Sequence, residues 1–227
     1  MTDKVLLITG ASSGIGAATA KAAAAAGWRL ALAARSRDRL ESLAGEIGSE
    51  VLTIPTDVTD FESQTRMAEE TVARLGRIDA VFANAGIGGE PGGFSGAPPE
   101  SWRRMVDTNI LGVAYTLRTT LSHLKSSRGH VLITSSVSGR RVIAGSMYSA
   151  TKWAVTAIGY NLREELRGTG IRVTLIEPGI VDTPFFDEPK PDGLRPEDVA
   201  RAVVYALDQP AGVDLHELTI LPTPPAT

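Results

Sequence analysis

A tyrosine and a lysine four residues apart are the first candidates for chemistry in this chain. Tyr148 and Lys152 stand in the sequence Tyr-Ser-Ala-Thr-Lys, and this spacing places both side chains on one face of a helix, about one turn apart. A free tyrosine titrates near pH 10, so lowering its pKa toward 7 takes roughly 4 kcal/mol of preference for the phenolate. A neighbouring ammonium group and desolvated hydrogen-bond donors supply such a preference. The pair predicts a tyrosine that acts as a general acid or base.

Two adjacent serines upstream offer a hydroxyl that can orient a carbonyl group. They lie in the segment Ser135-Ser136-Val137-Ser138-Gly139, at the end of a predicted strand. A tyrosine and a lysine at this spacing occur by chance more often than for chemistry. A serine-tipped strand before the same helix, in a chain that also carries a glycine loop, is a much rarer combination.

The glycine loop near the N-terminus predicts a nucleotide site. Its sequence, TGASSGIG at 9–16, follows the first predicted strand and opens the first predicted helix. Gly10, Gly14 and Gly16 allow a tight turn, close approach of the backbone to phosphate, and close packing of the helix on the strand. The helix N-terminus offers free N–H groups to a pyrophosphate. The spacing and the absence of a lysine after Gly16 disfavour a nucleoside-triphosphate loop. A purely structural turn is the alternative.

The end of the second predicted strand bears on which dinucleotide binds. A carboxylate there would hold the ribose 2′-hydroxyl of NAD, but the sequence reads Ala34-Arg35-Ser36-Arg37. Arg35 and Arg37 suit the 2′-phosphate of NADP instead, with the Ser12 and Ser13 hydroxyls as supporting donors. We therefore expect NADP(H) to be favoured over NAD(H).

The composition excludes several classes of protein. The 227 residues include 23 basic and 26 acidic side chains, for a net charge of −3, which argues against a nucleic-acid partner. The absence of cysteine excludes disulfides and thiolate chemistry. His123, His130 and His216 lie far apart without metal-ligand spacing, so we expect no metal site. No apolar stretch approaches the roughly eighteen residues of a membrane span, and no signal peptide is recognised; we expect no membrane partner and a cytoplasmic protein.

The elements that must position these residues alternate between strands and helices. Most of the strands are continuous apolar runs, which is typical of a parallel sheet covered on both faces. The strands are predicted at Val5–Thr9, Leu30–Ala34, Val51–Ile54, Ile78–Ala83, His130–Ser135, Ile171–Ile176 and Glu217–Leu221. The helices are predicted near 14–26, 36–47, 60–75, 99–125, 147–167 and 196–208. The order predicts an α/β fold in a single domain, 1–227.

Two of the predicted helices carry distinct apolar patterns. In the helix at 99–125, seven apolar residues recur at intervals of three or four and predict one continuous stripe: Trp102, Val106, Ile110, Val113, Leu117, Leu121 and Leu124. The segment Trp153–Tyr160 is apolar nearly all round, so it needs a second surface to bury against. A partner subunit is the simplest candidate, and an intrachain loop is the alternative.

Two irregular segments are predicted to be loops at one edge of the sheet rather than linkers between domains: Gly86–Pro99, and a short segment at about 184–196. The second carries Phe185 and Phe186, which either line the acceptor side of the site or cover a local apolar patch. We expect this segment to contact the substrate.

Over essentially its full length the chain resembles the short-chain dehydrogenase/reductases. The motifs that carry the resemblance are TGASSGIG at 9–16, Asp57-Val58, NAG at 84–86, Asn109 in DTNILG, SSVSG, YSATK at 148–152 and PGIVDT at 178–183. The resemblance implies a Rossmann fold whose seven-stranded parallel sheet has the order 3-2-1-4-5-6-7, with helices on both faces.

The resemblance also implies a catalytic tetrad of Asn109, Ser136, Tyr148 and Lys152. Tyr148 would protonate the carbonyl oxygen in reduction, Ser136 would hold that oxygen, and Asn109 would anchor a water. Lys152 would lower the tyrosine pKa and bind the nicotinamide ribose. The loop and the resemblance together imply the cofactor-binding residues Gly10, Ser12, Ser13, Gly14, Ile15, Gly16, Arg35, Arg37, Asp57, Val58, Asn84, Ala85, Gly86, Tyr148, Lys152, Pro178, Gly179, Ile180, Val181 and Thr183, and the substrate residues Ser136, Tyr148, Phe185 and Phe186.

The serine assignment departs from the family pattern. The usual separation of serine and tyrosine is thirteen residues, which selects Ser135, whereas the SxxG pattern selects Ser136 at a separation of twelve. We select Ser136, because a one-residue deletion between Arg140 and Met147 explains the spacing without moving the motif at the strand end.

These observations predict an NADP(H)-dependent oxidoreductase that interconverts a small-molecule carbonyl and an alcohol and assembles as a homodimer or homotetramer. A non-catalytic dinucleotide-binding regulator on the same fold is the alternative, and the intact tetrad argues against it. An epimerase or dehydratase relative is disfavoured, because no substrate-domain extension follows the sixth strand.

Overall fold

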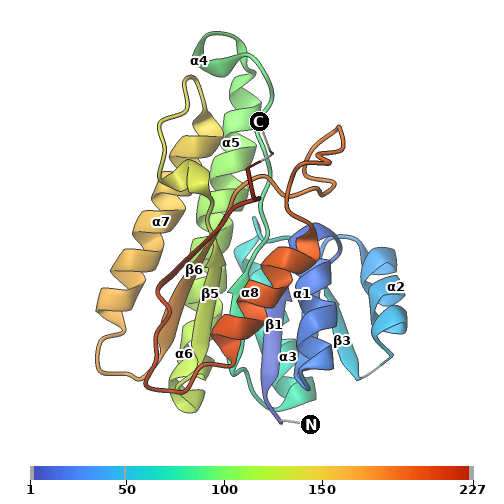
Figure 1. The fold of residues 1–227 in the computed structure, drawn as a ribbon. Helices are drawn as coiled ribbons and strands as arrows, with labels where there is room; N and C mark the ends of the chain where they lie inside the picture. The colour runs from blue at the N-terminus through green and yellow to red at the C-terminus, as the bar shows by residue number, and fades with distance from the viewer. Residues whose placement is uncertain (1–2, 49, 225–227) are drawn as a thin grey trace.

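The computed structural model describes residues 3–48 and 50–224 and arranges them as a seven-stranded sheet between two layers of helices (Figure 1). The strand order is β3-β2-β1-β4-β5-β6-β7, and every pair of neighbours is parallel. The strands are β1 (Val5–Thr9), β2 (Arg29–Ala34), β3 (Val51–Pro55), β4 (Ala80–Ala83), β5 (His130–Thr134), β6 (Arg172–Pro178) and β7 (Glu217–Ile220). The predicted fold class and strand order are confirmed.

Alternating residues of each central strand pack into two separate cores, one on each face of the sheet. On one face, Val5 and Leu7 of β1 pack in the core that the helices α3, α6 and α7 cover. On the other face, Leu6 and Ile8 pack in the core beneath α1, α2 and α8. All four side chains are fully buried, as expected of a parallel sheet with helices on both faces.

The helices follow the predicted order, with additions. They are α1 (Gly14–Ala25), α2 (Arg37–Ile47), α3 (Phe61–Leu75), α4 (Gly93–Gly96), α5 (Pro99–Met105), α6 (Gly112–Ser127), α7 (Met147–Glu165) and α8 (Pro196–Leu207), with a π-helical segment η1 (Val106–Leu111) and a 3-10 turn η2 (Val137–Gly139). The short helix α4 lies in the segment Gly86–Pro99, which was predicted to be irregular, and the turn η2 lies between a predicted strand and a predicted helix. The described helices include none that is long and apolar enough to cross a bilayer.

The helix predicted at 99–125 is interrupted, and this prediction of one continuous apolar stripe is wrong. The π-helical segment η1 separates α5 from α6 and changes the helical phase between them. Before and within η1, the buried side chains are Ser101, Met105 and Asn109, whereas Trp102 and Val106 are only half-buried. After η1, Val113, Leu117 and Leu124 are buried as predicted.

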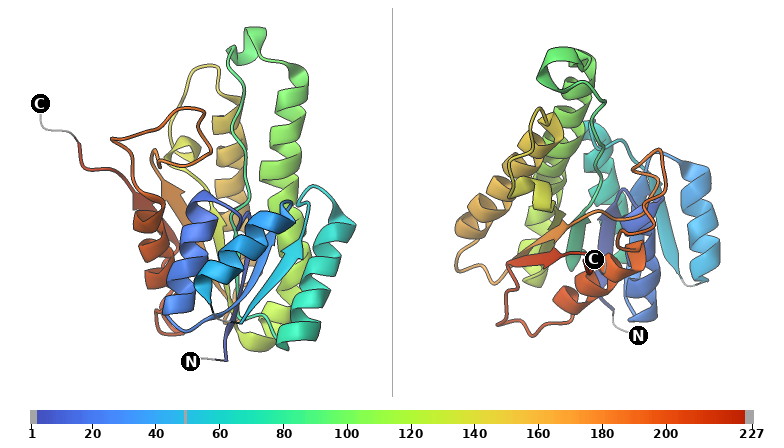
Figure 2. Two further views of the ribbon diagram at one scale, coloured as in Figure 1. Left: turned by 90° about the vertical axis from the view of Figure 1, so that its right-hand side faces the viewer. Right: turned by 45° about the horizontal axis from the view of Figure 1, so that its top comes forward.

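The carboxyl ends of β1, β2, β4, β5 and β6 meet at one edge of the sheet, where the chain leaves each strand in a different direction. Figure 2 shows α5 extending beyond this edge together with the loops before α7 and before α8. In open α/β sheets, ligands bind in the crevice outside the carboxyl ends of the strands. The fold therefore gathers the predicted site residues at this one edge.

Candidate active site

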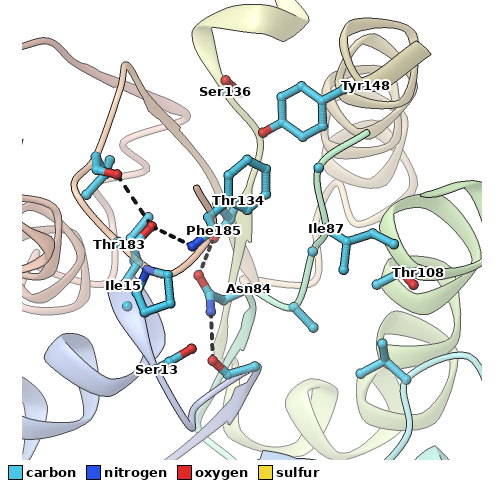
Figure 3. A pocket seen from close by; sticks show the side chains of 18 of the residues that line it. Ser13, Ile15, Asn84, Ile87, Thr108, Thr134, Ser136, Tyr148, Thr183 and Phe185 are labelled. Atoms are coloured by element: carbon cyan, nitrogen blue, oxygen red, sulfur yellow. Dashed lines mark hydrogen bonds between the residues drawn. The ribbon is translucent and has the colours of Figure 1, made fainter. Parts of the chain in front are cut away.

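A cavity of about 1270 Å³ opens at the carboxyl edge of the sheet, between the glycine loop and the first turn of α7 (Figure 3). Its volume is above the roughly 300–1,000 Å³ usual for small-ligand pockets, so it has room for a ligand larger than a single small substrate. Most of the predicted site residues line it. Gly16, Arg37 and Asn109 do not.

The glycine loop packs against the end of β4 at distances that only glycine permits. A Cβ on Gly10, which has a φ of +66°, would lie 2.8 Å from the Cα of Ala85. A Cβ on Gly16 would overlap the carbonyl oxygen of Gly10. Gly16 therefore permits close packing beneath the loop and does not line the cavity. The helix α1 begins after Ser13, whose side chain makes no capping hydrogen bond. The first N–H groups of α1 therefore face the cavity without a side-chain cap.

Asn84 holds the ends of three strands together. Its backbone N–H donates to Thr9 Oγ1 at 3.1 Å, and its side-chain amide donates to the carbonyl of Gly10 at 3.3 Å. Thr134 Oγ1 donates to Asn84 Oδ1 at 3.0 Å. Figure 3 shows the hydrogen bonds of the Asn84 side chain, including the one with Thr134. The glycine loop is thus fixed relative to β5, which leads into the serine segment.

The two adjacent serines after β5 point in different directions. Ser136 lies in the cavity wall beside Tyr148, accepts from the N–H of Ser138 at 3.1 Å, and interacts with the Tyr148 hydroxyl. Ser135 is 1% exposed, and its hydroxyl lies 2.7 Å from that of Thr156 on α7. An extended strand end turns successive side chains to opposite faces. Because of this alternation, the hydroxyl of Ser136 lies next to Tyr148, whereas the hydroxyl of Ser135 points toward α7.

Lys152 is buried with its ammonium group at the cavity. Its Nζ donates to the carbonyl oxygen of Thr134 at 2.7 Å, the one protein acceptor it has in the described part of the chain. Desolvation lowers the pKa of Lys152 from 10.5 to about 8. An ammonium group has three N–H donors, so hydroxyl groups of a bound ligand can accept the others.

Tyr148 lies one helical turn before the lysine, as predicted from the spacing. Lys152 Nζ is 5.8 Å from the centre of the Tyr148 ring. Desolvation raises the pKa of Tyr148 to about 12, and hydrogen bonding with Ser136 opposes this rise. The phenol is therefore protonated at neutral pH and can donate a proton to an oxygen placed between it and Ser136.

Asn109 acts behind the cavity wall. Its Oδ1 accepts from the N–H of Ile87 at 2.9 Å, and its Nδ2 donates to the carbonyl of Ile87 at 3.0 Å and to Thr151 Oγ1 at 3.1 Å. It thereby ties the segment after β4 to the N-terminal part of α7. The π-helical segment η1 places Asn109 at this position, and π-bulges of this kind occur often at functional sites.

The arginines after β2 divide between the cavity and the surface. Arg35, Ser36 and Arg39 line the cavity. Arg37, which the sequence favoured, instead has its guanidinium 3.6 Å from Glu41 on the outer face of α2. Sequence reasoning missed Arg39. A signal was available, because side chains on a helix point back toward its N-terminus, and Arg39 is the third residue of α2, after the N-cap Ser36.

The far side of the cavity is closed by the segment after β6. Thr183 lies over the glycine loop, since a Cβ on Gly14 would lie 3.2 Å from Thr183 Cγ2. Phe185 packs against the Tyr148 ring with ring centres 5.6 Å apart, and Gly88 provides the space for it, because a Cβ there would lie 3.2 Å from Phe185 Cζ. Figure 3 shows the Phe185 ring next to the tyrosine hydroxyl.

These features suit a dinucleotide. The glycine loop leaves no space for side chains where phosphates would approach, Ser13 leaves the first N–H groups of α1 uncapped, and Lys152 offers unused donors. The same cavity contains Tyr148 and Ser136, a proton donor and a hydroxyl that can hold an oxygen. This arrangement allows proton transfer to an oxygen near a bound dinucleotide.

Comparisons with known proteins agree with this geometry. The family model described as short chain dehydrogenase matches residues 4–192. An uncharacterised oxidoreductase of Staphylococcus haemolyticus is 40% identical over 228 residues, covering 98% of each chain.

Two solved structures are similar to the whole chain. One is an alcohol dehydrogenase of the archaeon Thermococcus sibiricus complexed with 5-hydroxy-NADP, with a TM-score of 0.92, 37% identity and 99% of each chain covered. The other is a 3-ketoacyl-(acyl-carrier-protein) reductase of Brucella melitensis complexed with NADH, with a TM-score of 0.89, 30% identity and 96% of each chain covered.

Alanine substitutions can distinguish the roles of Ser135 and Ser136. We expect Ser136→Ala to lower the turnover rate by a factor of ten or more, because it removes the hydroxyl beside Tyr148. The same substitution removes the hydrogen bond from the Ser138 N–H, so we expect it to lower the free energy of unfolding by about 1 kcal/mol as well. Ser135→Ala should leave turnover within a few fold but destabilise the protein by about 1 kcal/mol, because it removes a buried hydrogen bond. Steady-state kinetics and urea denaturation of both variants measure these effects. A larger loss of activity for Ser135→Ala would transfer the role to Ser135.

Proposed function

The chain belongs to the short-chain dehydrogenase/reductase family of oxidoreductases, and on that basis we propose that it transfers a hydride between NADP(H) and a small carbonyl or alcohol substrate, with Tyr148 as the proton donor or acceptor. The observation that carries the proposal is the position of Tyr148 between Ser136 and the buried Lys152, inside a cavity that also contains the glycine loop. A carbonyl oxygen between the Tyr148 and Ser136 hydroxyls would receive a hydrogen bond from each.

Each residue has a distinct task in this proposal. In reduction, Tyr148 donates its proton to the oxygen of the substrate while Ser136 holds that oxygen in place. Lys152 stabilises the resulting phenolate through its positive charge and holds the ribose hydroxyls with its unused donors. The nicotinamide, when bound, supplies or accepts the hydride. Asn109 keeps the segment at Ile87 against α7 and so maintains the shape of the site.

The protonation state of Tyr148 matches the reductive direction, but burial makes the phenol a weaker acid than free tyrosine, so the phenolate that forms needs the positive charge of Lys152. With a pKa of about 12, the phenol holds its proton throughout the neutral range. Oxidation requires the phenolate, so the positive charge of Lys152 has to act together with that of an oxidised nicotinamide to lower this pKa. Lys152 itself loses its proton as the pH rises through about 8. At neutral pH, Lys152 therefore still carries a positive charge near Tyr148.

For the cofactor, we propose that Arg35 and Arg39 together hold the 2′-phosphate of NADP. Both line the cavity at the end of β2, where a carboxylate would select NAD. Charge-assisted contacts of this kind contribute about 1.5–3 kcal/mol, or roughly a ten- to hundredfold preference. At the other end, Thr183 and the backbone at Ile180 and Val181 are proposed to hold the carboxamide.

A regulator that binds a dinucleotide without turnover is the alternative function. Nothing in such a role requires a buried lysine, a tyrosine and a serine around one cavity. Incubation of the purified protein with NADPH and a panel of aldehydes and ketones tests the choice, with loss of NADPH absorbance as the measurement. The proposal expects consumption that depends on the carbonyl compound. Tight NADPH binding with no consumption across the panel would favour the regulator.

For assembly, we propose a homodimer or homotetramer that uses the outer face of α7. Trp153, Ala157 and Tyr160 recur at helical spacing on that face and are all exposed, Trp153 by 47% and Tyr160 by 41%. Exposed apolar surface of this kind is typical of protein interfaces.

The cofactor proposal makes a specific prediction with a matched control. Arg35→Asp should weaken NADPH binding by tenfold or more and strengthen NADH binding, because it removes a cation, repels the phosphate and offers an acceptor to the ribose. Arg39→Ala should also weaken NADPH binding. Arg37→Ala serves as the control, since its guanidinium faces Glu41. Fluorescence titrations at low salt measure the affinities of the parent protein and the three variants for both cofactors. Equal affinity of the parent protein for NADH and NADPH would refute the arginine assignment.

The assembly proposal is tested by light scattering. The parent protein should have the mass of a dimer or a tetramer at micromolar concentration, and Ala157→Glu should dissociate or unfold it, because it places a charge in the interface. A parent protein that stays monomeric at that concentration would contradict the proposal.

A further inference from the structure

The serine segment leaves the sheet immediately after its last backbone hydrogen bond. The strands β5 and β6 pair as far as Thr134 and Ile176, and the N–H of Ser135 still donates to the carbonyl of Ile176 at 2.8 Å. After Ser136 the chain turns away as η2, while β6 continues to pair with β7 through Pro178. In the described part of the chain, backbone pairing with β6 therefore ends one residue before the serine of the candidate active site.

Beyond that point, two side-chain hydrogen bonds among the described residues connect this turn to β6. Ser136 Oγ donates to the carbonyl oxygen of Pro178 at 3.4 Å, which is long for a hydrogen bond. Arg140, the residue that ends η2, donates from Nε to Glu177 Oε1 at 2.9 Å. A charge-assisted bond is the stronger kind. The Arg140–Glu177 ion pair is therefore the main side-chain link between η2 and β6.

Glu177 is a buried carboxylate whose two oxygen atoms both accept hydrogen bonds. Its side chain is 2% exposed. Arg140 donates to Oε1, and Thr219 Oγ1 on β7 donates to Oε2 at 3.1 Å. A buried charge is costly unless it is paired and hydrogen-bonded. Without the arginine, Thr219 would be the one side-chain donor left to this carboxylate among the described residues.

The guanidinium group of Arg140 also contacts α7 and β7. Its Nη2 donates to the hydroxyl of Tyr160 on α7 at 3.2 Å, and the group lies 5.2 Å from the centre of the Tyr160 ring. The same nitrogen forms an ion pair with Glu217 on β7. A planar guanidinium directs several donors at once, whereas a lysine ammonium is a compact point charge. The geometry therefore favours arginine at this position.

The turn η2 is also packed against α7. Ser149 Oγ on this helix donates to the carbonyl oxygen of Ser138 at 2.7 Å. A Cβ on Gly139 would lie 2.6 Å from the carbonyl oxygen of Lys152, so the turn lies directly on the helix. The turn is thus held both by the helix that carries the tyrosine and, through the ion pair, by β6.

We propose that Arg140 is a positioning residue for the reaction: its ion pair with Glu177 holds η2 against β6 and so keeps the Ser136 hydroxyl beside Tyr148. Arg140 does not line the active-site cavity, so it acts through the serine rather than on the substrate. The proposal rests on the proposed function, because it assumes that Ser136 holds the substrate oxygen. A displacement of about 1 Å in an active site can lower a rate by about 10²-fold, so a loosened turn lowers turnover.

Arg140→Met tests the role of the ion pair, because it removes the guanidinium group and keeps an unbranched apolar side chain. We expect kcat for carbonyl reduction to fall roughly tenfold or more, while the NADPH dissociation constant stays within about twofold because the glycine loop is unchanged. Arg141→Met is the matched control, since Arg141 is exposed and its side chain has no hydrogen bond or ion pair among the described residues. A kcat of Arg140→Met equal to that of the control would overturn the proposal.

A second substitution separates positioning from charge balance. In Arg140→Met the buried Glu177 has lost its partner, so the urea midpoint of unfolding should fall as well. Adding Glu177→Gln removes the unpaired charge and should restore most of the midpoint, but kcat should stay low because the turn is still not attached to β6. Recovery of kcat together with stability would mean that the pair only balances charge, and the positioning role would be wrong.

A double-mutant cycle with Ser136→Ala tests whether Arg140 acts through the serine. In the Ser136→Ala protein, Arg140→Met should lower kcat by less than about twofold further, because the hydroxyl that it positions is already absent. A merely structural ion pair would give the same loss with and without the serine hydroxyl. Losses that multiply would therefore contradict the proposal.

Crystal structures of the parent protein and of Arg140→Met, both without substrate, test the position of the serine independently of activity. We expect Ser136 Oγ to move by about 1 Å or more from its place beside Tyr148. Serines that superimpose would overturn the positioning proposal whatever the activity. Failure of the parent protein to reduce any carbonyl compound would instead overturn the proposed function.

Discussion

The site depends on one interaction, the hydrogen bond from the buried Lys152 ammonium to the carbonyl oxygen of Thr134. Burial shifts the lysine pKa from 10.5 to about 8, which means that the charged form is about 3 kcal/mol less favourable than it is in water. This desolvation of the Lys152 ammonium group occurs where α7 packs against the end of β5. The cation then lies next to Tyr148, at the edge of the sheet where the glycine loop and the serine segment also end.

The surrounding polar groups keep this arrangement rigid. Asn84 ties the glycine loop to β5 through Thr134, the residue whose carbonyl holds the lysine. Asn109 ties the segment after β4 to α7 near the lysine. These bonds fix the glycine loop, β5 and α7 relative to one another, and so hold the groups around Tyr148 in place. Preorganised donors of this kind make up a large share of what enzymes contribute to catalysis.

Much of this could be predicted from the sequence, because continuous apolar runs and the spacing of Tyr148 and Lys152 follow simple periodicities. Three features could not. The π-helical segment at Asn109 has no periodic signal and shifts the apolar stripe that a regular helix would show. Whether Arg37 or Arg39 faces the cavity depends on the directions of their side chains at the start of α2. A second cavity, of about 250 Å³, arises beside Tyr148 where α5 and the loop before α7, distant in sequence, come together.

The central claim is that Tyr148 transfers the proton in a site that Lys152 and the glycine loop have already assembled. Substitution of Tyr148 by Phe tests it most directly, with turnover and NADPH affinity measured on the same preparation. The claim predicts that turnover falls by about 10²–10⁴-fold, the contribution typical of a general acid. The NADPH dissociation constant should stay within about twofold, because the substitution removes one hydroxyl and leaves the glycine loop and Lys152 unchanged. Turnover within tenfold of the parent protein would contradict it.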